Sequence, residues 1–358
     1  MTKSNRVTKL AVCLAIIATS IVAVPTSADA ARAQAKQANG KATTTAKAPA
    51  RSTPKKKAYS AAAARTRRAN LARARAAARA RELRELQTPR FRVDEFGREV
   101  PDVRAEAAII YNPTTGEVLW EDHAQDQRSI ASITKVMTAL VFLESGAPLE
   151  APMTVVRSDV ARASTTYLRS GFKLTAGDLL NLLLVGSDNA AARALARISP
   201  YGAKGFIDKM NEKAAELGLV NTRYADPSGL LATNVSSAYD QARLIAHASA
   251  DERVGGIMRK QTYSTKSGKQ TITARSTNQI VRNGDIDVVG GKTGFINRAG
   301  YCLATLLRLP STGEQVAVVV LGAKSNASRF WETRHLFNWM SARTKALLDG
   351  EQQQQQEN

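Results

Sequence analysis

The sequence predicts a single α/β domain of about 240 residues that follows a long basic arm. Strand-like stretches stand at both ends of residues 104–347, and helix-like stretches occupy the region between them, an order typical of one α/β domain. Residues 31–103, which we call the basic arm, are rich in Ala, Lys, Arg, Thr and Pro and poor in large apolar side chains. The core must therefore come from the residues that follow the arm.

The first strands are expected in "AEAAIIYNPTTGEVLWEDHA", where two short apolar runs flank a turn at Asn112 to Gly116. The next segment, "RSIASITKVMTAL", predicts a helix because its apolar residues recur at helical spacing. These residues are Ile133, Val136, Met137 and Leu140.

Three more helical patterns follow: "LTAGDLLNLLLVGSDNAAARALARI" with a break at Gly186, "GAKGFIDKMNEKAAELGL" ending at Gly218, and "SAYDQARLIAHASA". Two strand-like stretches, "DVVGGKTGFINRAGYCLATLLRL" and "EQVAVVVLGAK", are joined by the turn "PSTG". A last helix, "ASRFWETRHLFNWMSARTKALL", leads into a polar tail at 348–358.

Residues 1–30 have the pattern of a secretory signal peptide. Lys3, Arg6 and Lys9 precede an apolar run of about 15 residues, shorter than the roughly 20 of a membrane span. Ala28-Asp29-Ala30 fits a cleavage site, and Cys13 lies too far inside the apolar run for lipid modification. We expect a cleaved signal and an exported, periplasmic protein, with a retained membrane anchor as the alternative.

The formal charge of +20 belongs mostly to the basic arm, since residues 31–90 hold 17 basic and 2 acidic side chains. Its first part is expected to be disordered, and "AAAARTRRANLARARAAARARELREL" is built from strong helix formers. The arm either holds the protein near an anionic envelope surface or serves as a solvated spacer. Because the signal directs export, nucleic acid is not the expected partner.

Neither metal nor cofactor chemistry is expected. Without the signal, Cys302 is the single cysteine, which excludes an internal disulfide and predicts a small buried apolar side chain. The histidines at positions 123, 247 and 335 are too far apart to indicate a zinc site or a Ser-His-Asp triad.

A serine nucleophile with a lysine base is the chemistry that the sequence indicates. Ser-x-x-Lys occurs three times, at Ser52/Lys55, Ser132/Lys135 and Ser170/Lys173. The first lies in the basic arm and the third spans a glycine in a polar turn. Residues three apart on a helix share a face, so Lys135 can reach the hydroxyl of Ser132. The amine must be neutral to accept a proton, which requires apolar surroundings or a second cation.

Two later motifs complete the constellation. Ser187-Asp188-Asn189 follows an apolar helix, where its hydroxyl and amide can face a cleft. Lys292-Thr293-Gly294 lies in an expected strand: Lys292 supplies the second cation, Thr293 a hydroxyl for a substrate carboxylate, and Gly294 room for an extended peptide. The similar triplets at 266–268 and 276–278 were set aside, the first as a polar turn and the second for its position in the order.

In this order the three motifs are similar to those of penicillin-binding proteins and serine β-lactamases. The flanks "ASITKVMTAL", "MNEKAAELGLVNTRYADPSGL" and "KTGFINRAGYCLA" resemble the D-alanyl-D-alanine carboxypeptidase/endopeptidase family, peptidase family S11, from about Ala105 to Leu347. The resemblance implies a β-lactamase/transpeptidase-like α/β fold, with a mostly antiparallel sheet flanked by helices and an inserted helical subdomain. It implies cleavage of D-Ala-containing bonds in peptidoglycan stem peptides, with β-lactams as covalent inhibitors.

The resemblance also implies roles. Ser132 would form the acyl-enzyme with Lys135 as its base, Ser187 would pass a proton to the leaving amine, and Asn189 would orient Lys135 and the substrate. Lys292 and Thr293 would position the substrate beside Gly294, and the backbone N–H groups of Ser132 and Phe295 would form the oxyanion hole. The turn at 226–229 also matches the family and is interpreted as structural.

Two other functions remain in competition. A class A β-lactamase would carry Glu-x-x-Leu-Asn between the second and third motifs, and no such pentapeptide occurs there, so slow deacylation of penicillins is expected. A non-catalytic cell-wall-binding protein would keep the cleft without its chemistry. The chain ends after its last helix, without the β-rich second domain of many carboxypeptidases, which slightly favours the endopeptidase branch.

Overall fold

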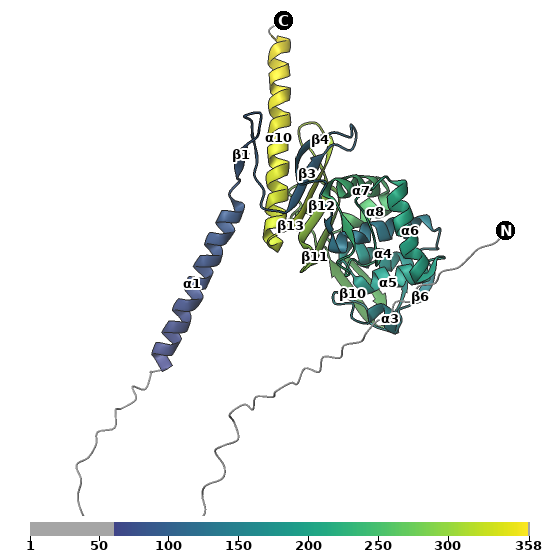
Figure 1. The fold of residues 1–358 in the computed structure, drawn as a ribbon. Coiled ribbons are helices and arrows are strands. Elements are labelled where there is room, and N and C mark those ends of the chain that lie inside the picture. The colour runs from purple at the N-terminus through teal and green to yellow at the C-terminus, as the bar shows by residue number, and fades with distance from the viewer. Residues whose placement is uncertain (1–60, 357–358) are drawn as a thin grey trace, which may run out of the picture. The chain divides into compact units, whose positions relative to one another are not determined.

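The computed structural model describes residues 61–356. The expected signal peptide and the first part of the basic arm therefore lie outside the described residues. Within the described part, an antiparallel five-stranded sheet of order β11-β12-β13-β3-β4 forms the centre of the domain (Figure 1). Its strands are β3 (Ala107–Tyr111), β4 (Val118–Asp122), β11 (Val288–Ile296), β12 (Gly300–Arg308) and β13 (Gln315–Ala323).

The two ends of the domain meet in this sheet, because β13 pairs with β3 along Ala317↔Tyr111 to Leu321↔Ala107. Side chains alternate between faces along each strand. Ile109 and Val319 contribute to the core beneath the helices, whereas Ile110 and Val318 contribute to a second core with Phe330. Strand β13 is apolar and buried at nearly every position because both of its faces are covered.

The second face packs against helix α10, Asn326–Gln356, which runs beside the strands in Figure 1. Its first half carries the apolar residues Phe330, Leu336 and Phe337 that face the sheet. The expected helix ended near Leu347, and the structure continues it through the polar residues to Gln356.

Most of a helical insertion between β4 and β11 covers the other face, whereas its last helix contributes Ile280 and Val281 to the second core (Figure 1). This insertion agrees with the fold that the motifs implied. Its helices are a 3₁₀ turn η1 (Ala131–Thr134), α2 (Lys135–Glu144), α3 (Arg157–Val160), α4 (Ala176–Val185), α5 (Asn189–Ile198), α6 (Gly202–Glu216), α7 (Ala238–Ala250), α8 (Glu252–Met258) and α9 (Gln279–Asn283). Its short strands are β5 (Arg128–Ser129), β6 (Pro152–Thr154), β7 (Lys173–Thr175), β8 (Val235–Ser236), β9 (Thr262–Ser267) and β10 (Gln270–Arg275).

The structure differs from the expected elements elsewhere as well. The stretch from Asp287 to Leu309 holds two strands, β11 and β12, because Ala299 donates its backbone N–H to Ile296 and closes a tight turn. The hairpin β9–β10 was not expected, since its residues are polar and partly exposed. The helix expected at Ser132 begins as a 3₁₀ turn and becomes α-helical at Lys135.

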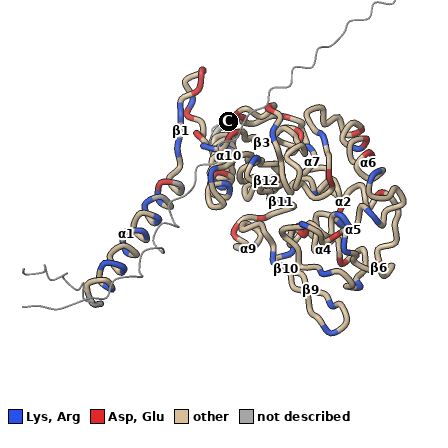
Figure 2. Tube along the Cα trace, turned by 60° about the horizontal axis from the view of Figure 1, so that its bottom comes forward, with Lys and Arg blue, Asp and Glu red and all other residues tan. Residues whose placement is uncertain are grey.

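The helix-forming part of the basic arm is helix α1, Ala61–Gln87, which is followed by the hairpin β1 (Phe91–Val93) and β2 (Glu99–Pro101). Figure 2 shows Lys and Arg along α1, and its described side chains are exposed, Leu71 and Leu83 among them. Across residues 61–356, no helix combines the length and the apolar content that a bilayer crossing requires.

Candidate active site

Ser132 is held in the 3₁₀ turn η1 directly before helix α2, with Lys135 as the first residue of that helix. The Nζ atom of Lys135 lies 2.8 Å from the Oγ atom of Ser132. Ala131, next to Ser132, has a φ of +47°, in the left-handed region that side chains rarely adopt. Such strain is retained only where surrounding contacts enforce it, and it sets the direction in which Ser132 leaves the chain.

Two acceptors besides Ser132 bind the amine of Lys135. Lys135 Nζ donates to Asn189 Oδ1 over 2.7 Å and to the backbone carbonyl of Ser228. The amide of Asn189 is oriented by its Nδ2, which donates to Ala163 O over 2.7 Å. A neutral amine has two N–H groups and one lone pair. Because the two acceptors use both N–H groups, the lone pair is left for the hydroxyl proton of Ser132.

Burial lowers the pKa of Lys135 to about 7, against the attraction of Asp226 and Asp188, and the charge of Arg193 lowers it further. The side chain is fully buried. The sequence predicted apolar surroundings or a second cation, Lys292. Burial is the largest cause, Arg193 is a cation that lowers the pKa of Lys135, and Lys292 is coupled to Lys135 through the lowering of its own pKa.

Lys292 points from strand β11 to the second motif, with its Nζ 2.8 Å from Ser187 Oγ and 2.9 Å from Thr293 O. Burial and the charges of Lys135 and Arg329 hold the pKa of Lys292 well below its usual range. Two ammonium groups in one buried site repel each other, so the site favours a state in which at least one of these lysines is neutral.

Ser187 stands in the break between helices α4 and α5, at a φ of +58°. Asp188 caps α5 by accepting the backbone N–H of Ala191 over 2.9 Å, and it also accepts the backbone N–H of Tyr167. These bonds fix the break, so the hydroxyl of Ser187 and the amide of Asn189 face one cleft.

Strand β11 passes against the 3₁₀ turn at Gly294. A Cβ atom added there would lie 2.5 Å from Ile130 O and 3.2 Å from Ser132 N, so only glycine permits this approach. Phe295 follows with its side chain 46% exposed. The approach brings the backbone of Ser132 beside that of β11, where the two predicted oxyanion-hole donors must lie to act together.

All the predicted residues are brought together. A cleft of about 550 Å³ is lined by Ser132, Ser187, Asn189, Thr293, Gly294 and Phe295. Lys135 and Lys292 lie beneath it and reach it through Ser132 and Ser187. The other two Ser-x-x-Lys matches do not contribute: Ser52/Lys55 lies outside the described residues, and Lys173 opens the exposed end of strand β7.

Three contributions were missed by sequence reasoning. Thr277, in a triplet that was set aside, has its Oγ1 2.6 Å from Thr293 Oγ1 and lines the cleft. Arg329 of α10 lines it as well, with Nη1 2.9 Å from Gly294 O and 3.1 Å from Cys302 O, and no motif marks it. Burial lowers the pKa of Arg329 to about 10. The carbonyl of Ser228 acts through the backbone, which no side-chain pattern reveals.

The turn that supplies this carbonyl is braced by Asp226, which accepts from Ser228 N, Ser228 Oγ, Gly229 N and Leu231 N. Thr138 of α2 also donates to Pro227 O over 2.6 Å. The turn was interpreted as structural. The structure shows that it is also in direct contact with Lys135 and with the backbone before Ser132.

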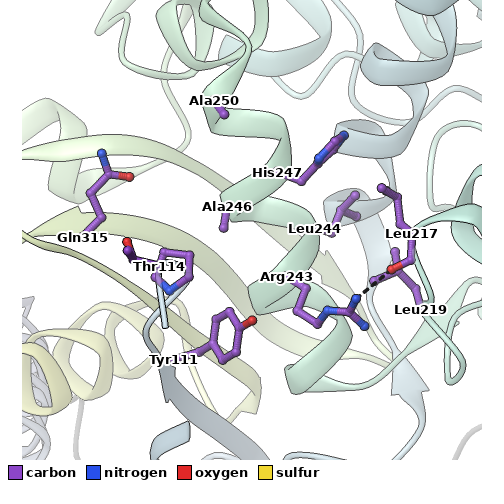
Figure 3. A pocket seen from close by; sticks show the side chains of 11 residues that line it. Tyr111, Thr114, Leu217, Leu219, Arg243, Leu244, Ala246, His247, Ala250 and Gln315 are labelled. Atoms are coloured by element: carbon purple, nitrogen blue, oxygen red, sulfur yellow. Dashed lines mark hydrogen bonds between the residues drawn. The ribbon is translucent and has the colours of Figure 1, made fainter. Parts of the chain in front are cut away.

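A separate cavity of about 410 Å³ lies between helix α7 and the β3–β4 turn (Figure 3). Its guanidinium, Arg243, already donates to Gly218 O over 2.8 Å and to Leu217 O over 2.9 Å. None of the predicted catalytic residues lines it.

Comparison with known proteins agrees with this geometry. The family model described as D-alanyl-D-alanine carboxypeptidase, peptidase S11, matches residues 94–325. A D-alanyl-D-alanine endopeptidase of Escherichia coli is 33% identical over 244 residues, covering 67% of this chain and 78% of that protein. A D-alanyl-D-alanine carboxypeptidase of Bacillus subtilis is 30% identical over 236 residues, covering 63% of this chain and 59% of that protein.

The fold agrees as well. The crystal structure of the Streptomyces K15 DD-transpeptidase superposes with a TM-score of 0.62 at 29% identity, covering 67% of this chain and 97% of that one. The family model spans the two outer strands of the sheet, β4 and β11, and all three motifs. This chain therefore belongs to peptidase family S11, and it is a serine-type hydrolase of the D-alanyl-D-alanine carboxypeptidase/endopeptidase class.

Proposed function

We propose that this protein cleaves D-Ala-containing peptide bonds of peptidoglycan through an acyl-enzyme on Ser132, with a preference for bonds that cross-link two stem peptides. The observation that carries the mechanism is the setting of Lys135: a buried amine with a pKa of about 7, 2.8 Å from Ser132 Oγ, whose other contacts are both acceptors.

Acylation begins when Ser132 Oγ attacks the carbonyl carbon of D-Ala and passes its proton to Lys135 Nζ. The carbonyl oxygen becomes an oxyanion, which the N–H groups of Ser132 and Phe295 stabilise, each worth about 3–4 kcal/mol in comparable enzymes. As the C–N bond breaks, Ser187 gives its proton to the leaving amine and is reprotonated by Lys292, its hydrogen-bond partner, which is restored by the proton that Lys135 took from Ser132. In deacylation the neutral Lys135 takes a proton from the attacking water and delivers it to Ser132 Oγ as the ester C–O bond breaks.

The substrate's end is held by Thr293, Thr277 and Arg329. The two threonine hydroxyls lie together at the cleft, and the guanidinium of Arg329 supplies a positive charge beside them. Hydroxyl donors with a cation match a carboxylate on the leaving residue.

The preference for cross-links rests on relatives named for that activity. The D-alanyl-D-alanine endopeptidases of Escherichia coli, Haemophilus influenzae and Pseudomonas aeruginosa are 33–34% identical to this chain, and the carboxypeptidases among its relatives are 29–30% identical. Both activities need the same chemistry at Ser132, so the difference must lie in the room given to the second peptide.

β-Lactams acylate the same serine in this proposal. We expect that ester to persist, because Glu-x-x-Leu-Asn, whose glutamate activates the deacylating water in class A β-lactamases, does not occur between Asn189 and Lys292. Rapid turnover of a chromogenic β-lactam would contradict this part.

The protein is proposed to act outside the cytoplasm, after removal of residues 1–30. There the basic arm would approach an anionic envelope surface. Helix α1 supports an approach to an anionic surface, because it contains eight arginines and only two glutamates, and its described side chains are exposed. A solvated spacer would show no binding to anionic envelope polymers at physiological salt.

Labelling with a fluorescent penicillin tests the nucleophile. The wild type should be labelled and Ser132→Ala should not, while Ser170→Ala, from the rejected match, should be labelled as the wild type is. Digestion of purified cross-linked muropeptides beside a pentapeptide ending in D-Ala–D-Ala then measures the preference. A wild type that takes no label and cleaves neither substrate would favour a non-catalytic wall-binding protein.

A further inference from the structure

A second hollow of about 400 Å³ continues the active-site cleft beyond the end of strand β11. The two hollows share Phe295 and Asn297. Three cations line the second hollow, and none of them belongs to the three motifs. They are Arg128 of β5, Arg298 of the β11–β12 turn, and Lys324 just after β13.

One carboxylate faces these three cations. Glu106 accepts from Lys324 Nζ over 2.7 Å and from Arg128 over 3.2 Å, so each of its oxygens is taken by one cation. Within residues 61–356, the exposed guanidinium of Arg298 makes neither an ion pair nor a hydrogen bond. The hollow therefore keeps an excess of positive charge, with Arg298 available to a ligand.

The course of the substrate leads to this hollow. Ser187, the proposed donor to the leaving amine, is bound to Lys292 near the middle of β11. The proposed oxyanion donor Phe295 lies three residues further along, so the acyl side of the substrate continues toward Ile296 and Asn297. Strand β11 is an edge of the sheet, which leaves its outer side open to an extended peptide.

The position of Arg298 sets the distance. Strand β11 ends at Ile296, one residue after Phe295, and Arg298 stands two residues further on in the turn. An extended peptide that continues along β11 past Phe295, at about 3.3 Å per residue, reaches the turn with its second or third residue. The turn is ordered by the Ala299 N–H to Ile296 O bond of 3.0 Å, and the stacked rings of Phe295 and Tyr301, 4.2 Å apart, form an apolar wall.

We propose that Arg298, Arg128 and Lys324 form a subsite for a free carboxylate on the acyl side of the substrate peptide, two to three residues before the cleaved bond. This rests on the proposed function and adds to it a preference for acidic peptides. Glu106 opposes that preference, because it neutralises part of the charge that the ligand would meet. The two contributions can be separated, since Arg298 and Glu106 are each replaceable by a glutamine of similar size.

The test compares two synthetic substrates that are identical except for a free carboxylate or a carboxamide at that acyl-side residue. The measured quantity is the ratio of their kcat/KM values. We expect a preference for the carboxylate of about tenfold in the wild type, falling to about threefold or less in Arg298→Gln and rising in Glu106→Gln. The matched control Arg308→Gln, an exposed arginine at the far end of β12 that pairs with Asp287, should keep the wild-type ratio.

Three other outcomes would contradict the proposed subsite. An equal ratio in the wild type and Arg298→Gln, with normal penicillin labelling of both, would exclude it while leaving the proposed function intact. A second substrate pair that varies the carboxylate on the leaving side should not respond to Arg298→Gln, and a response confined to that pair would contradict the acyl-side placement. If the wild type cleaves neither substrate and takes no label, the proposed function fails, and the subsite with it.

Discussion

Gly229 is the residue whose substitution should most sharply separate the architecture of the site from its chemistry. It lies in the Asp226 turn with a φ of +79°, and a Cβ atom added there would lie 2.0 Å from Ala131 O and 2.9 Å from Ser132 N. Ordinary contact begins near 3.4 Å, so the carbonyl of Ala131 must move by about 1.4 Å, the difference between 3.4 and 2.0 Å. Because Ala131 precedes Ser132, the nucleophile moves with it.

The Gly229→Ala change should therefore slow acylation by about 100-fold, the usual cost of displacing a catalytic group by roughly 1 Å. Stability should fall as well, by about 1–2 kcal/mol for an alanine in the left-handed region and about 1–3 kcal/mol for overpacking. The assay is the second-order rate of labelling by a fluorescent penicillin, measured beside the midpoint of thermal unfolding.

Gly268→Ala is the matched control, because Gly268 has a φ of +58° and nothing within 4 Å of an added Cβ. It carries the backbone strain without the collision. It should lose stability through that strain alone and should label at the wild-type rate. Equal labelling rates in folded Gly229→Ala and Gly268→Ala would refute the claim that this turn positions Ser132.

Three further predictions follow from buried titratable groups. Lys135 acts as a base only when neutral, so the acylation rate should rise with pH up to about 7 and then level off. An acylation rate that does not change between pH 5 and pH 9 would exclude Lys135 as the base. Burial raises the pKa of Glu332 to about 7 from 4.5, so the folded state binds the extra proton and loses stability as pH rises across that window. The unfolding midpoint of Glu332→Gln, measured from pH 4.5 to 7, should gain on the wild type with rising pH, and a constant difference would count against a buried, titrating Glu332. Burial raises the pKa of Cys302 to about 11, so mass spectrometry should find its peptide unmodified by iodoacetamide in the native protein and alkylated in denaturant; native alkylation would contradict its burial.

Much of the fold could be predicted because its elements have strong local signals. The strands β3 and β4 are short apolar runs around a turn, and the capped helices α4 and α5 flank a glycine break. The hairpin β9–β10 gave no such signal, since its polar residues make it resemble a loop. The division of the stretch from Asp287 to Leu309 into β11 and β12 was hidden because both strands are buried on both faces and show no alternation of apolar and polar residues.

Part of the site was likewise readable. Ser132 and Lys135 are neighbours in sequence, so their contact follows from helical spacing alone. The motifs around Ser187 and Lys292 were chosen by their order and flanks, and the structure places those two side chains 2.8 Å apart. Thr277 was rejected by the same rule of order, although it lies beside Thr293.

The sequence by itself determined the class of domain, the order of the three motifs and the residues that carry them, because these depend on local spacing and composition. Only the tertiary structure decided that burial and Arg193 depress the pKa of Lys135, that the carbonyl of Ser228 holds its amine, and that Arg329 enters the cleft from the last helix. It also decided that Arg128, Arg298 and Lys324 surround one hollow. A pKa depends on desolvation and on charges from distant segments, and a pocket depends on which segments meet, so neither is a property of neighbouring residues.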